Sequence, residues 1–577
     1  MKKHITLILC AILAFGMLAT ALGEQLDYLN YESARPIVKE GHEVKLTFGF
    51  RTSSLHTKPE GSLYFRMVEQ LFGITPEFIP IDDAVMDEKF NLMFAANEIP
   101  DVMMDFPFSK SNDGGTDLIM RYGVEEGQLL ALNDYITEEL MPNVYALSQA
   151  DPDFLAFATA PDGNIYNIPR KLDTVPSYDN PHIRVTWLNA LGLESPTTLD
   201  EFLDTMRLFK EKDVDGHGSE NVYPIGGCFD NQLNPFGLIL NALGYNMEYT
   251  WTSAKWGSGL GIALRDGEAT FPCSDDLYYE FLKIAKMCYD EQLISPDFFT
   301  MDASQVNAMA YEGVLGYLCW PLHVILTEPK DYQEWYMIAP LTSAWNEKAQ
   351  TPSGPSYDMF SIFVSADTKY PEVCARFIDS YYGDDNLLLG IGPYYGTPEA
   401  ELLGTPGWIL RDDGSREFPV DMEGNGVNFY YGEWPGRFSF GRVETDFIKY
   451  TEQKAAGVEI TENQKGWLEQ YYEDYDHIEY GDDLGKWIGY GSAYMVWPHS
   501  EPGYPRTVFR TADTVAKIAD YSAVIEPYVK EQFAMFVTGK RALNEEEFAK
   551  YLTELKAMGM DEYEQIFKDE YAAYLAH

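Results

Sequence analysis

The sequence predicts an α/β protein that folds into two or more lobes. Its 577 residues are more than a single hydrophobic core ordinarily holds, so a division into lobes is expected. Between residues 44 and 106, short apolar runs alternate with segments of helical spacing, which is the order of a sheet with crossover helices. Farther along the chain, capped helices again stand between short apolar runs.

The first region predicts three strands and two helices. Its strand-like runs are rich in aromatic and β-branched residues, and a turn residue or a helical pattern follows each of them. Phe90, Met93 and Phe94 share one helical stripe, and Pro100 ends that helix. The predicted strands are 44–50, 75–82 and 102–106, and the predicted helices lie within 62–74 and 87–101.

The helix predicted at 199–212 has the clearest start signal in the chain. Thr198 and Glu201 have the spacing of a capping box, in which each side chain bonds to the backbone of the other residue. Apolar residues then recur at helical spacing, which predicts one buried face. The residues of that face are Leu199, Phe202, Leu203, Met206 and Phe209.

The later part of the chain predicts fewer regular elements. Helices are expected at 276–291 and 371–383, with a strand at 361–366. Residues 386–510 are rich in glycine, proline and aromatic residues and have weak periodicity, which predicts loops and short elements. An asparagine-capped helix is expected at 544–559, in an elaborated helical C-terminal region.

The charge and the aromatic content narrow the possible functions. The formal net charge is −49, from 42 basic and 91 acidic residues, and such a charge repels nucleic acid and anionic lipid. The alternative interpretation is that the acidic residues only keep the protein soluble. The aromatic fraction is 15%, with 40 tyrosines and 11 tryptophans, more than a core alone requires. Amphipathic rings of this kind suit a binding cleft.

The first residues resemble a secretory leader. Lys2 and Lys3 precede an apolar run from Ile5 to Leu18 and then small residues, which predicts a signal peptide over residues 1–23. A membrane anchor is the alternative, but the run is short for a span and polar sequence follows. Lipid attachment at Cys10 is disfavoured because large residues precede it. The predicted location is secreted or on the extracellular cell surface.

The cysteines do not form a recognisable framework. Beyond the leader there are five, at irregular spacing and without a CxxC pair, so neither a zinc site nor a dense disulfide frame is indicated. Most are expected to be small buried hydrophobic residues. One disulfide is possible, but the sequence does not assign its two cysteines. The five are Cys228, Cys273, Cys288, Cys319 and Cys374.

A loop after the 199–212 helix has part of a calcium-binding pattern. Asp213 and Asp215 stand at the first and third positions and Gly218 at the sixth, as in the front half of an EF-hand loop. His217 is a poor ligand for a hard cation, and Pro224 stands where that loop places a bidentate glutamate. Either a structural calcium ion or an ordinary polar turn is expected. The metal-ligand candidates are Asp213, Asp215, His217, Ser219 and Asn221.

Several segments, in order along the chain, resemble the extracellular solute-binding proteins of bacterial ABC importers, family 1, in their long oligosaccharide-binding form. The resemblance covers roughly residues 40–400 and 515–575. The segments that carry it are KFNLMFAANEIPDVMMD (89–105), DGNIYNIP (162–169), WLNALGLESPTTLDEFLDTMRLFKEKDVDGHG (187–218), LISPDFFT (293–300), YEGVLGYLCW (311–320) and the helices that start with FVTGK at residue 536.

This resemblance implies a two-lobe periplasmic-binding-protein-like fold of type II, with crossing hinge strands. One lobe would comprise 40–172 and 338–388, and the other 173–337 and 389–577. The implied function is capture of an oligosaccharide or other carbohydrate between the lobes and delivery to the permease subunits of an ABC transporter in the membrane. Hinge closure on the ligand is the implied motion. No resident cofactor is implied apart from the open calcium question, and a monomer is expected.

The predicted ligand site combines strand ends and aromatic residues. Asp105 and Arg51 lie at the ends of predicted strands, where ligands of α/β sheets bind. Trp320 follows a strand-like run at the place where the resembled family has an aromatic platform. Aromatic rings stack on the C–H faces of sugars, and core packing is the alternative role of each ring. The other candidates are Tyr394, Tyr395, Trp434, Arg437 and Trp497.

Catalytic motifs are missing from the sequence. There is no HExxH zinc motif, no GxSxG elbow and no Walker loop. A glycosidase carboxylate pair stays open, because 91 acidic residues offer too many candidates. The sequence therefore predicts a binding protein, not an enzyme. A secreted carbohydrate-active enzyme and a ligand-sensing binding protein are the alternatives.

Overall fold

A computed structural model describes most of the chain in two compact units. The described residues are 25–52, 63–82, 85–104, 116–172, 181–229, 233–247, 257–319, 334–353, 357–359, 362–383, 388–389, 396–403, 409–410, 416–417, 442–443, 495–505 and 507–575. Unit 1 is formed by Met1–Lys110, Leu118–Lys171 and Tyr357–Val443. Unit 2 is formed by Ser111–Asp117, Leu172–Ser356 and Glu444–His577.

The units differ from the predicted lobes after residue 337. The sequence assigned 338–388 to the first lobe, whereas residues up to 356 group with unit 2. There β11 (Thr351–Ser353) pairs with β17 (Ser500–Pro502). The segment that follows, up to Val443, groups with unit 1 instead of the predicted second lobe. The pairing of β11 with β17 accounts for the first of these differences, because both strands belong to unit 2, and sequence periodicity does not report such a distant pairing.

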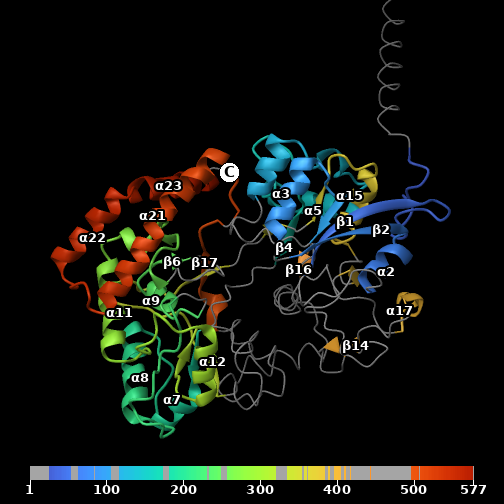
Figure 1. Ribbon diagram of the computed structural model, residues 1–577. Helices are drawn as coiled ribbons and strands as arrows, with labels where there is room; N and C mark the ends of the chain where they lie inside the picture. The colour runs from blue at the N-terminus through green and yellow to red at the C-terminus, as the bar shows by residue number, and fades with distance from the viewer. Residues whose placement is uncertain are drawn as a thin grey trace, which may run out of the picture. The chain divides into compact units, whose positions relative to one another are not determined.

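Unit 1 contains a four-stranded sheet in the order β13-β3-β1-β2. β1 (Val44–Thr52) pairs in parallel with β2 (Ile74–Asp82) and β3 (Val102–Met104). β13 (Ile362–Val364) is antiparallel to β3. All four strands and both helices of this region were predicted from sequence, and they are confirmed. Figure 1 shows β1 and β2 side by side, with α2, α3 and α15 around them.

Aromatic packing holds the helices of unit 1 on this sheet. α2 (Leu63–Gln70) and α15 (Pro371–Asp379) both reach Phe48 of β1, through ring contacts of Phe65 and Phe377 at 5.6 and 5.7 Å between centroids. α3 (Met86–Ala96) packs Phe94 against Tyr122 at 3.8 Å. Burial of such side chains is the main source of stability in a core of this kind.

The remaining elements of unit 1 are short. A second sheet has the order β12-β4-β16, and a two-stranded sheet joins β14 and β15. Their bounds, with those of the short helices, are β4 Pro169–Leu172, β12 Tyr357–Met359, β16 Arg442–Val443, β14 Ile409–Leu410, β15 Arg416–Glu417, η3 Ile119–Glu125, η4 Asn133–Tyr135, α5 Pro142–Ala150, α6 Pro152–Ala156 and α17 Pro398–Leu403. The short helix α4 (Thr116–Leu118) begins in a segment assigned to unit 2 and ends at the first residue of a segment assigned to unit 1.

Unit 2 is built around helices and short strands. β5 (His182–Arg184) lies between β10 (Trp335–Met337) and β9 (Tyr317–Leu318), antiparallel to both. α8 (Leu199–Lys212) has the predicted bounds and the predicted capping box, and both are confirmed. The other elements are α7 Val185–Leu191, α9 Gly237–Ala242, β6 Asn246–Met247, β7 Ala263–Arg265, β8 Glu268–Thr270, η5 Pro272–Ser274, α11 Tyr278–Asp290, α12 Ala303–Glu312 and η9 Trp497–His499.

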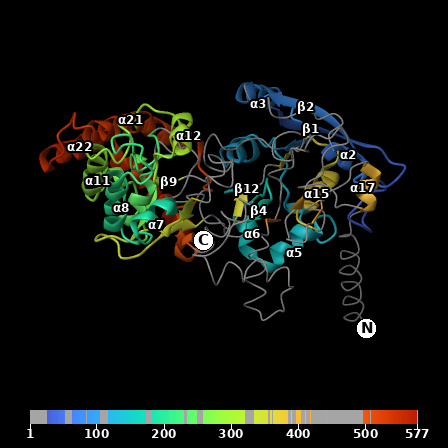
Figure 2. The same cartoon turned by 90° about the horizontal axis from the view of Figure 1, so that it is seen from below.

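Three C-terminal helices complete the core of unit 2. α21 (Ala512–Val537), α22 (Glu545–Ala557) and α23 (Met560–Leu575) contact one another, and α21 also lies along α11. Both views show α11, α21 and α22 together (Figures 1 and 2). Phe533 of α21 stacks on Phe229 and Phe281, so this helix belongs to the buried cluster of unit 2. Among the described residues, none of the helices combines the length and apolarity that a bilayer span requires.

Candidate functional site

The predicted ligand-binding residues fall mostly outside the described part of the chain. Arg51 lies in β1 and Trp497 in η9, but their side chains are outside the described set. The other candidates also lie outside the described residues, and their roles stay predictions. They are Asp105, Trp320, Tyr394, Tyr395, Trp434 and Arg437.

The backbone nevertheless places the carboxyl ends of β1 and β3 side by side, and Arg51 lies in β1 at that end. β1 and β3 are parallel, and Phe50 is in register with Met104. Arg51 is the next residue in β1, and Asp105 is the next residue in the chain after β3. The carboxyl ends of parallel strands form the edge at which α/β sheets bind ligands.

The candidate metal loop is described in full and has a compact geometry. Asp213 ends α8 in the left-handed region, with φ of 44°. Its Oδ1 accepts a hydrogen bond from the backbone N–H of His217 at 2.9 Å, and its Oδ2 accepts one from Gly218 at 2.8 Å. The Asn221 amide donates to the carbonyl of His217 at 2.8 Å. These bonds satisfy the backbone of a tight turn after the helix.

The second carboxylate of this loop, Asp215, contacts Trp187 and Arg184 of unit 2. Asp215 Oδ2 accepts from the indole N–H of Trp187 at 2.7 Å, and it lies 3.6 Å from a guanidinium nitrogen of Arg184. Arg184 is buried, with 8% of its surface exposed. A guanidinium beside a carboxylate repels a second cation that approaches the same carboxylate.

The described residues do not fit a calcium ion. Both oxygens of Asp213 already accept backbone hydrogen bonds, and Asp215 already faces a guanidinium. Within the described ranges, no group of three or more acidic, histidine or cysteine side chains is placed to hold a metal ion. The geometry favours the polar turn, the second of the two expectations from the sequence.

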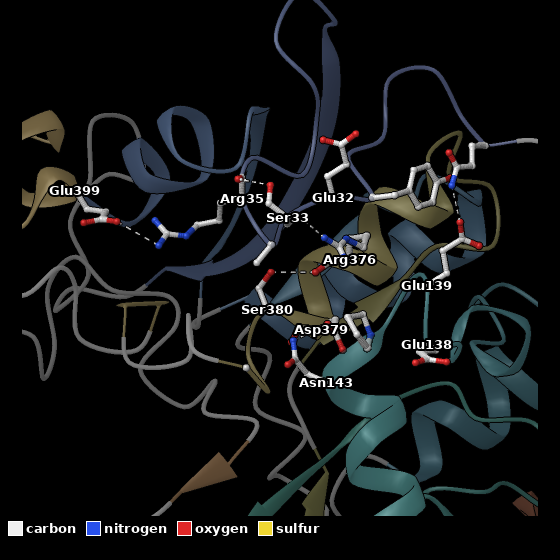
Figure 3. Close-up of a pocket in the computed structure, with 15 residues that line it drawn as sticks. Glu32, Ser33, Arg35, Glu138, Glu139, Asn143, Arg376, Asp379, Ser380 and Glu399 are labelled. Atoms are coloured by element: carbon white, nitrogen blue, oxygen red, sulfur yellow. Dashed lines mark hydrogen bonds and ion pairs between the residues drawn. The ribbon is translucent and has the colours of Figure 1, made fainter.

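A polar cavity in unit 1 was not predicted from sequence. It encloses about 820 Å³. The N-terminal segment, the start of α5, the end of α15 and Glu399 of α17 form its walls, as Figure 3 shows. Its parts come from residues far apart in the chain, and no single segment has a recognisable pattern. Only the fold brings them together.

The charged groups of this cavity are mostly occupied by neighbours. Buried Arg376 donates to the carbonyl of Ser33 at 2.8 Å, and burial lowers the pKa of its guanidinium. Buried Asp379 accepts from the backbone N–H of Val144 and the amide of Asn143, both at 2.8 Å. Burial raises the pKa of Asp379. These bonds tie the start of α5 to the end of α15, which is a structural role.

The five cysteines beyond the leader offer no nucleophile. All are buried thiols, so none of them forms the disulfide that the sequence left open. Burial raises the pKa of the Cys288 thiol to about 12, and it raises the pKa of Cys273 and Cys374 as well. A thiol of this kind stays protonated and unreactive at neutral pH.

Comparison with known proteins gives sequence relatives that are named as binding proteins or as a lipoprotein. No protein-family model matches the chain. The fructooligosaccharide ABC transporter substrate-binding protein FusA of Streptococcus pneumoniae serotype 4 is 24% identical over 351 residues, which is 59% of this chain and 61% of FusA. Lipoprotein LipO of Bacillus subtilis is 27% identical over 41% of this chain and 42% of LipO. The polygalacturonan/rhamnogalacturonan-binding protein YtcQ of the same species is 23% identical over 55% of this chain and 56% of YtcQ.

The chain thus spans about two fifths to three fifths of the length of these relatives. The predicted resemblance to extracellular solute-binding proteins is confirmed by them. These relatives are described as binding or substrate-binding proteins or as a lipoprotein, and none of their descriptions is that of an enzyme.

Solved structures match over nearly the whole chain. FusA of S. pneumoniae in complex with kestose has a TM-score of 0.63 at 21% identity and covers 92% of this chain and 99% of FusA. An EF-hand mutant of FusA with fructo-nystose has a TM-score of 0.62 at 21% identity, with the same coverage. A solute-binding protein of Bifidobacterium longum infantis, described as binding HMO, has a TM-score of 0.65 at 15% identity, again with this coverage. The predicted two-lobe fold is confirmed by these matches.

Proposed function

We propose that this protein is the extracellular substrate-binding component of an ABC transporter and that it captures an oligosaccharide or another carbohydrate. The observation that carries the proposal is the shared fold, over 92% of the chain, with FusA bound to kestose. The sequence relatives point the same way, because the names of FusA and YtcQ describe sugar polymers as their ligands. In this proposal units 1 and 2 are the two lobes.

The proposed work is binding and not catalysis. A ligand that has a higher affinity for one conformation shifts the population toward it, and the permease then recognises that conformation. The proposed partners are the carbohydrate and the permease subunits in the membrane, with the protein itself a monomer outside the cell. The signal peptide predicted at residues 1–23 supports export. The proposal includes no resident cofactor.

The proposed ligand residues are those predicted at the strand ends and in the aromatic segments. Arg51 serves a hydroxyl or acidic group of the sugar, Asp105 accepts from sugar hydroxyls, and Trp320 stacks on a sugar face. The net charge of −49 favours a neutral carbohydrate over a polyanion, because a polyanionic sugar would be repelled at long range.

A saccharide panel measured by thermal shift tests the proposal. A ligand that binds only the folded protein raises its Tm in a concentration-dependent way, by an amount that reflects RT ln(1 + [L]/Kd). The panel includes kestose, longer fructooligosaccharides and galacturonan fragments. Each sugar that raises the Tm is then incubated with the protein and analysed by chromatography. A sugar recovered at its original length agrees with binding, whereas shortened products would identify an enzyme. If no sugar raises the Tm, the proposal fails.

The Trp320→Ala variant tests the proposed stacking contact. We expect the affinity for the sugar identified by the panel to fall by about tenfold or more, with a small change in Tm, because one ring face is lost. Trp345→Ala is the matched control, since Trp345 is 45% exposed in unit 2 and outside the predicted ligand set. A large fall in the Tm of Trp320→Ala would instead indicate that the ring packs in the core.

A further inference from the structure

Residues 213–221, called here the aspartate loop, have the pattern of a metal loop but the contacts of a metal-free one. Four groups that such a loop gives to a cation are available for comparison: the carboxylates at its first and third positions, the backbone carbonyl at its seventh and the side chain at its ninth. In this chain these groups belong to Asp213, Asp215, Ser219 and Asn221. The oxygens of the first three already have a partner within the protein, and the Asn221 side chain bonds through its amide nitrogen.

We infer that two basic side chains, Arg184 and Lys210, hold the aspartate loop in place of a calcium ion, so that the fold of unit 2 is independent of metal. The inference concerns the stability of unit 2 and does not depend on which ligand the protein binds.

Arg184 is the first of the two internal cations. It ends β5, and its guanidinium donates to the carbonyl of Gly313 at 2.8 Å and to Glu334 from Nε at 3.1 Å. A further guanidinium nitrogen also bonds to Glu334. The ion pair with Asp215 then connects this network to the aspartate loop. A buried guanidinium is tolerated when its donors are satisfied in this way.

Two indole rings complete the surroundings of Arg184. Its guanidinium carbon lies 5.0 Å from the ring centre of Trp187 and 5.8 Å from that of Trp335. Trp187 also donates its N–H to Asp215, so one residue contacts both members of the ion pair. Cation–π contacts are strongest where water is excluded, and the Arg184 side chain is only 10% exposed.

Lys210 occupies the other side of the aspartate loop. Its Nζ donates to the carbonyl of Ser219 at 3.0 Å and to that of Val222 at 2.9 Å. The Ser219 carbonyl is at the seventh position, where a calcium loop offers its backbone oxygen to the metal. The ammonium also lies 5.1 Å from the ring centre of Tyr223, and burial lowers its pKa.

A calcium ion would therefore compete with two cations already in place. It would have to displace the ammonium of Lys210 from a carbonyl and approach Asp215 against the guanidinium of Arg184. Of the remaining candidates, the Asn221 side chain donates its amide nitrogen to the carbonyl of His217, and both oxygens of Asp213 accept the backbone hydrogen bonds that close the turn.

Thermal unfolding of the full mature chain, with excess calcium chloride and with EDTA, tests the inference directly. We expect the same Tm in both conditions, and we expect calorimetric titration with calcium to release no binding heat. A concentration-dependent rise of the Tm in calcium, by more than about 2 °C beyond that in sodium chloride of the same ionic strength, would overturn the inference, because screening alone does not give this excess and a ligand of the folded state does.

Two variants test the role assigned to the basic side chains. Arg184→Gln removes the buried cation and leaves its partners unpaired, and we expect the Tm of unit 2 to fall by about 6 °C or more. Lys210→Gln is the milder variant, and it provides the test if Arg184→Gln does not fold. We expect it to lower the Tm by about 2 °C.

The matched controls are Arg207→Gln and Lys212→Gln. Arg207 pairs with Asp204 and Glu291 and is 41% exposed, and Lys212 pairs with Glu211 and is 49% exposed. Exposed pairs of this kind contribute little to stability. If Arg184→Gln and Lys210→Gln lower the Tm no more than these controls do, the two residues do not hold the loop and the inference is wrong.

Discussion

Asp151 joins three elements of unit 1 through one carboxylate. It precedes α6 and accepts hydrogen bonds on Oδ2 from Lys171 of β4 at 2.5 Å and from Tyr357 of β12 at 2.7 Å. The hydrogen bond from Lys171 is the main reason why the pKa of Asp151 is lowered from its usual value. The residue therefore links the small sheet β12-β4-β16 to a helix through its charge.

This geometry predicts a pH-dependent effect of Asp151→Asn. A carboxyl group whose pKa is lower in the folded protein than in the unfolded chain stabilises the fold at pH values above its unfolded pKa. That stabilisation is lost as the pH falls from about 3.8, the ordinary value, through the lowered pKa. We expect the variant to be less stable than the wild type by about 1 kcal/mol at pH 7. The difference should shrink below about pH 4.

Urea unfolding of both proteins at several pH values measures the effect. Asp153→Asn is the control, because Asp153 is a neighbouring exposed carboxylate in the same helix. A stability difference that is the same at pH 7 and at about pH 2.5 would show that the Asp151 charge is not responsible.

Among the helices, α8 and α21 show what sequence patterns report and what they do not. α8 was predicted to the residue because its capping box and its apolar stripe are both local signals. α21 was missed, although it has 26 residues. Pro527 interrupts its pattern, and its buried residues begin only at Ile525. Packing against α11 and Phe229 holds this helix, and such distant contacts leave no local signature.

The cap of α8 predicts a defined loss of stability in Thr198→Ala. The Thr198 hydroxyl accepts from the backbone N–H of Glu201 at 3.2 Å, and the Glu201 carboxylate accepts from the backbone N–H of Thr198 at 3.2 Å. Loss of the hydroxyl leaves one N–H at the helix start without its partner, which costs about 1 kcal/mol. Urea unfolding measures it, with Ser195→Ala as an exposed control that caps no helix. An unchanged midpoint in Thr198→Ala would mean that water replaces the cap at no cost.

For the molecule as a whole, charge is the property with the most direct consequence. The net charge of −49 places many carboxylates near one another on a folded surface, and their repulsion opposes compaction. Because monovalent salt screens this repulsion, we expect the Tm to rise when sodium chloride is increased from about 0.01 M to about 0.3 M. Potassium chloride should act equally, since screening depends on ionic strength. A Tm that falls or stays constant would show that favourable ion pairs balance the repulsion.

The sequence predicted the architecture of the molecule better than the details of its sites. The strand and helix order around β1, β2 and β3 follows from local periodicity, and so it was found. The cavity beside Arg376 was not found, because its walls come from four distant segments. The aspartate loop was recognised, but its contact with Arg184 depends on the pairing of β5 with β10. A pattern within one segment predicts which side chains that segment presents, whereas the fold determines which residues they contact.

The buried cysteines have one more consequence. Cys374 lies in unit 1, and Cys228, Cys273, Cys288 and Cys319 lie in unit 2, all of them buried thiols. A thiol reagent can modify each of them only after the structure around it has opened. The native cysteines thus serve as built-in probes of local opening. The time that each thiol takes to be labelled reports how often its surroundings open, one cysteine for unit 1 and four for unit 2, with no probe introduced.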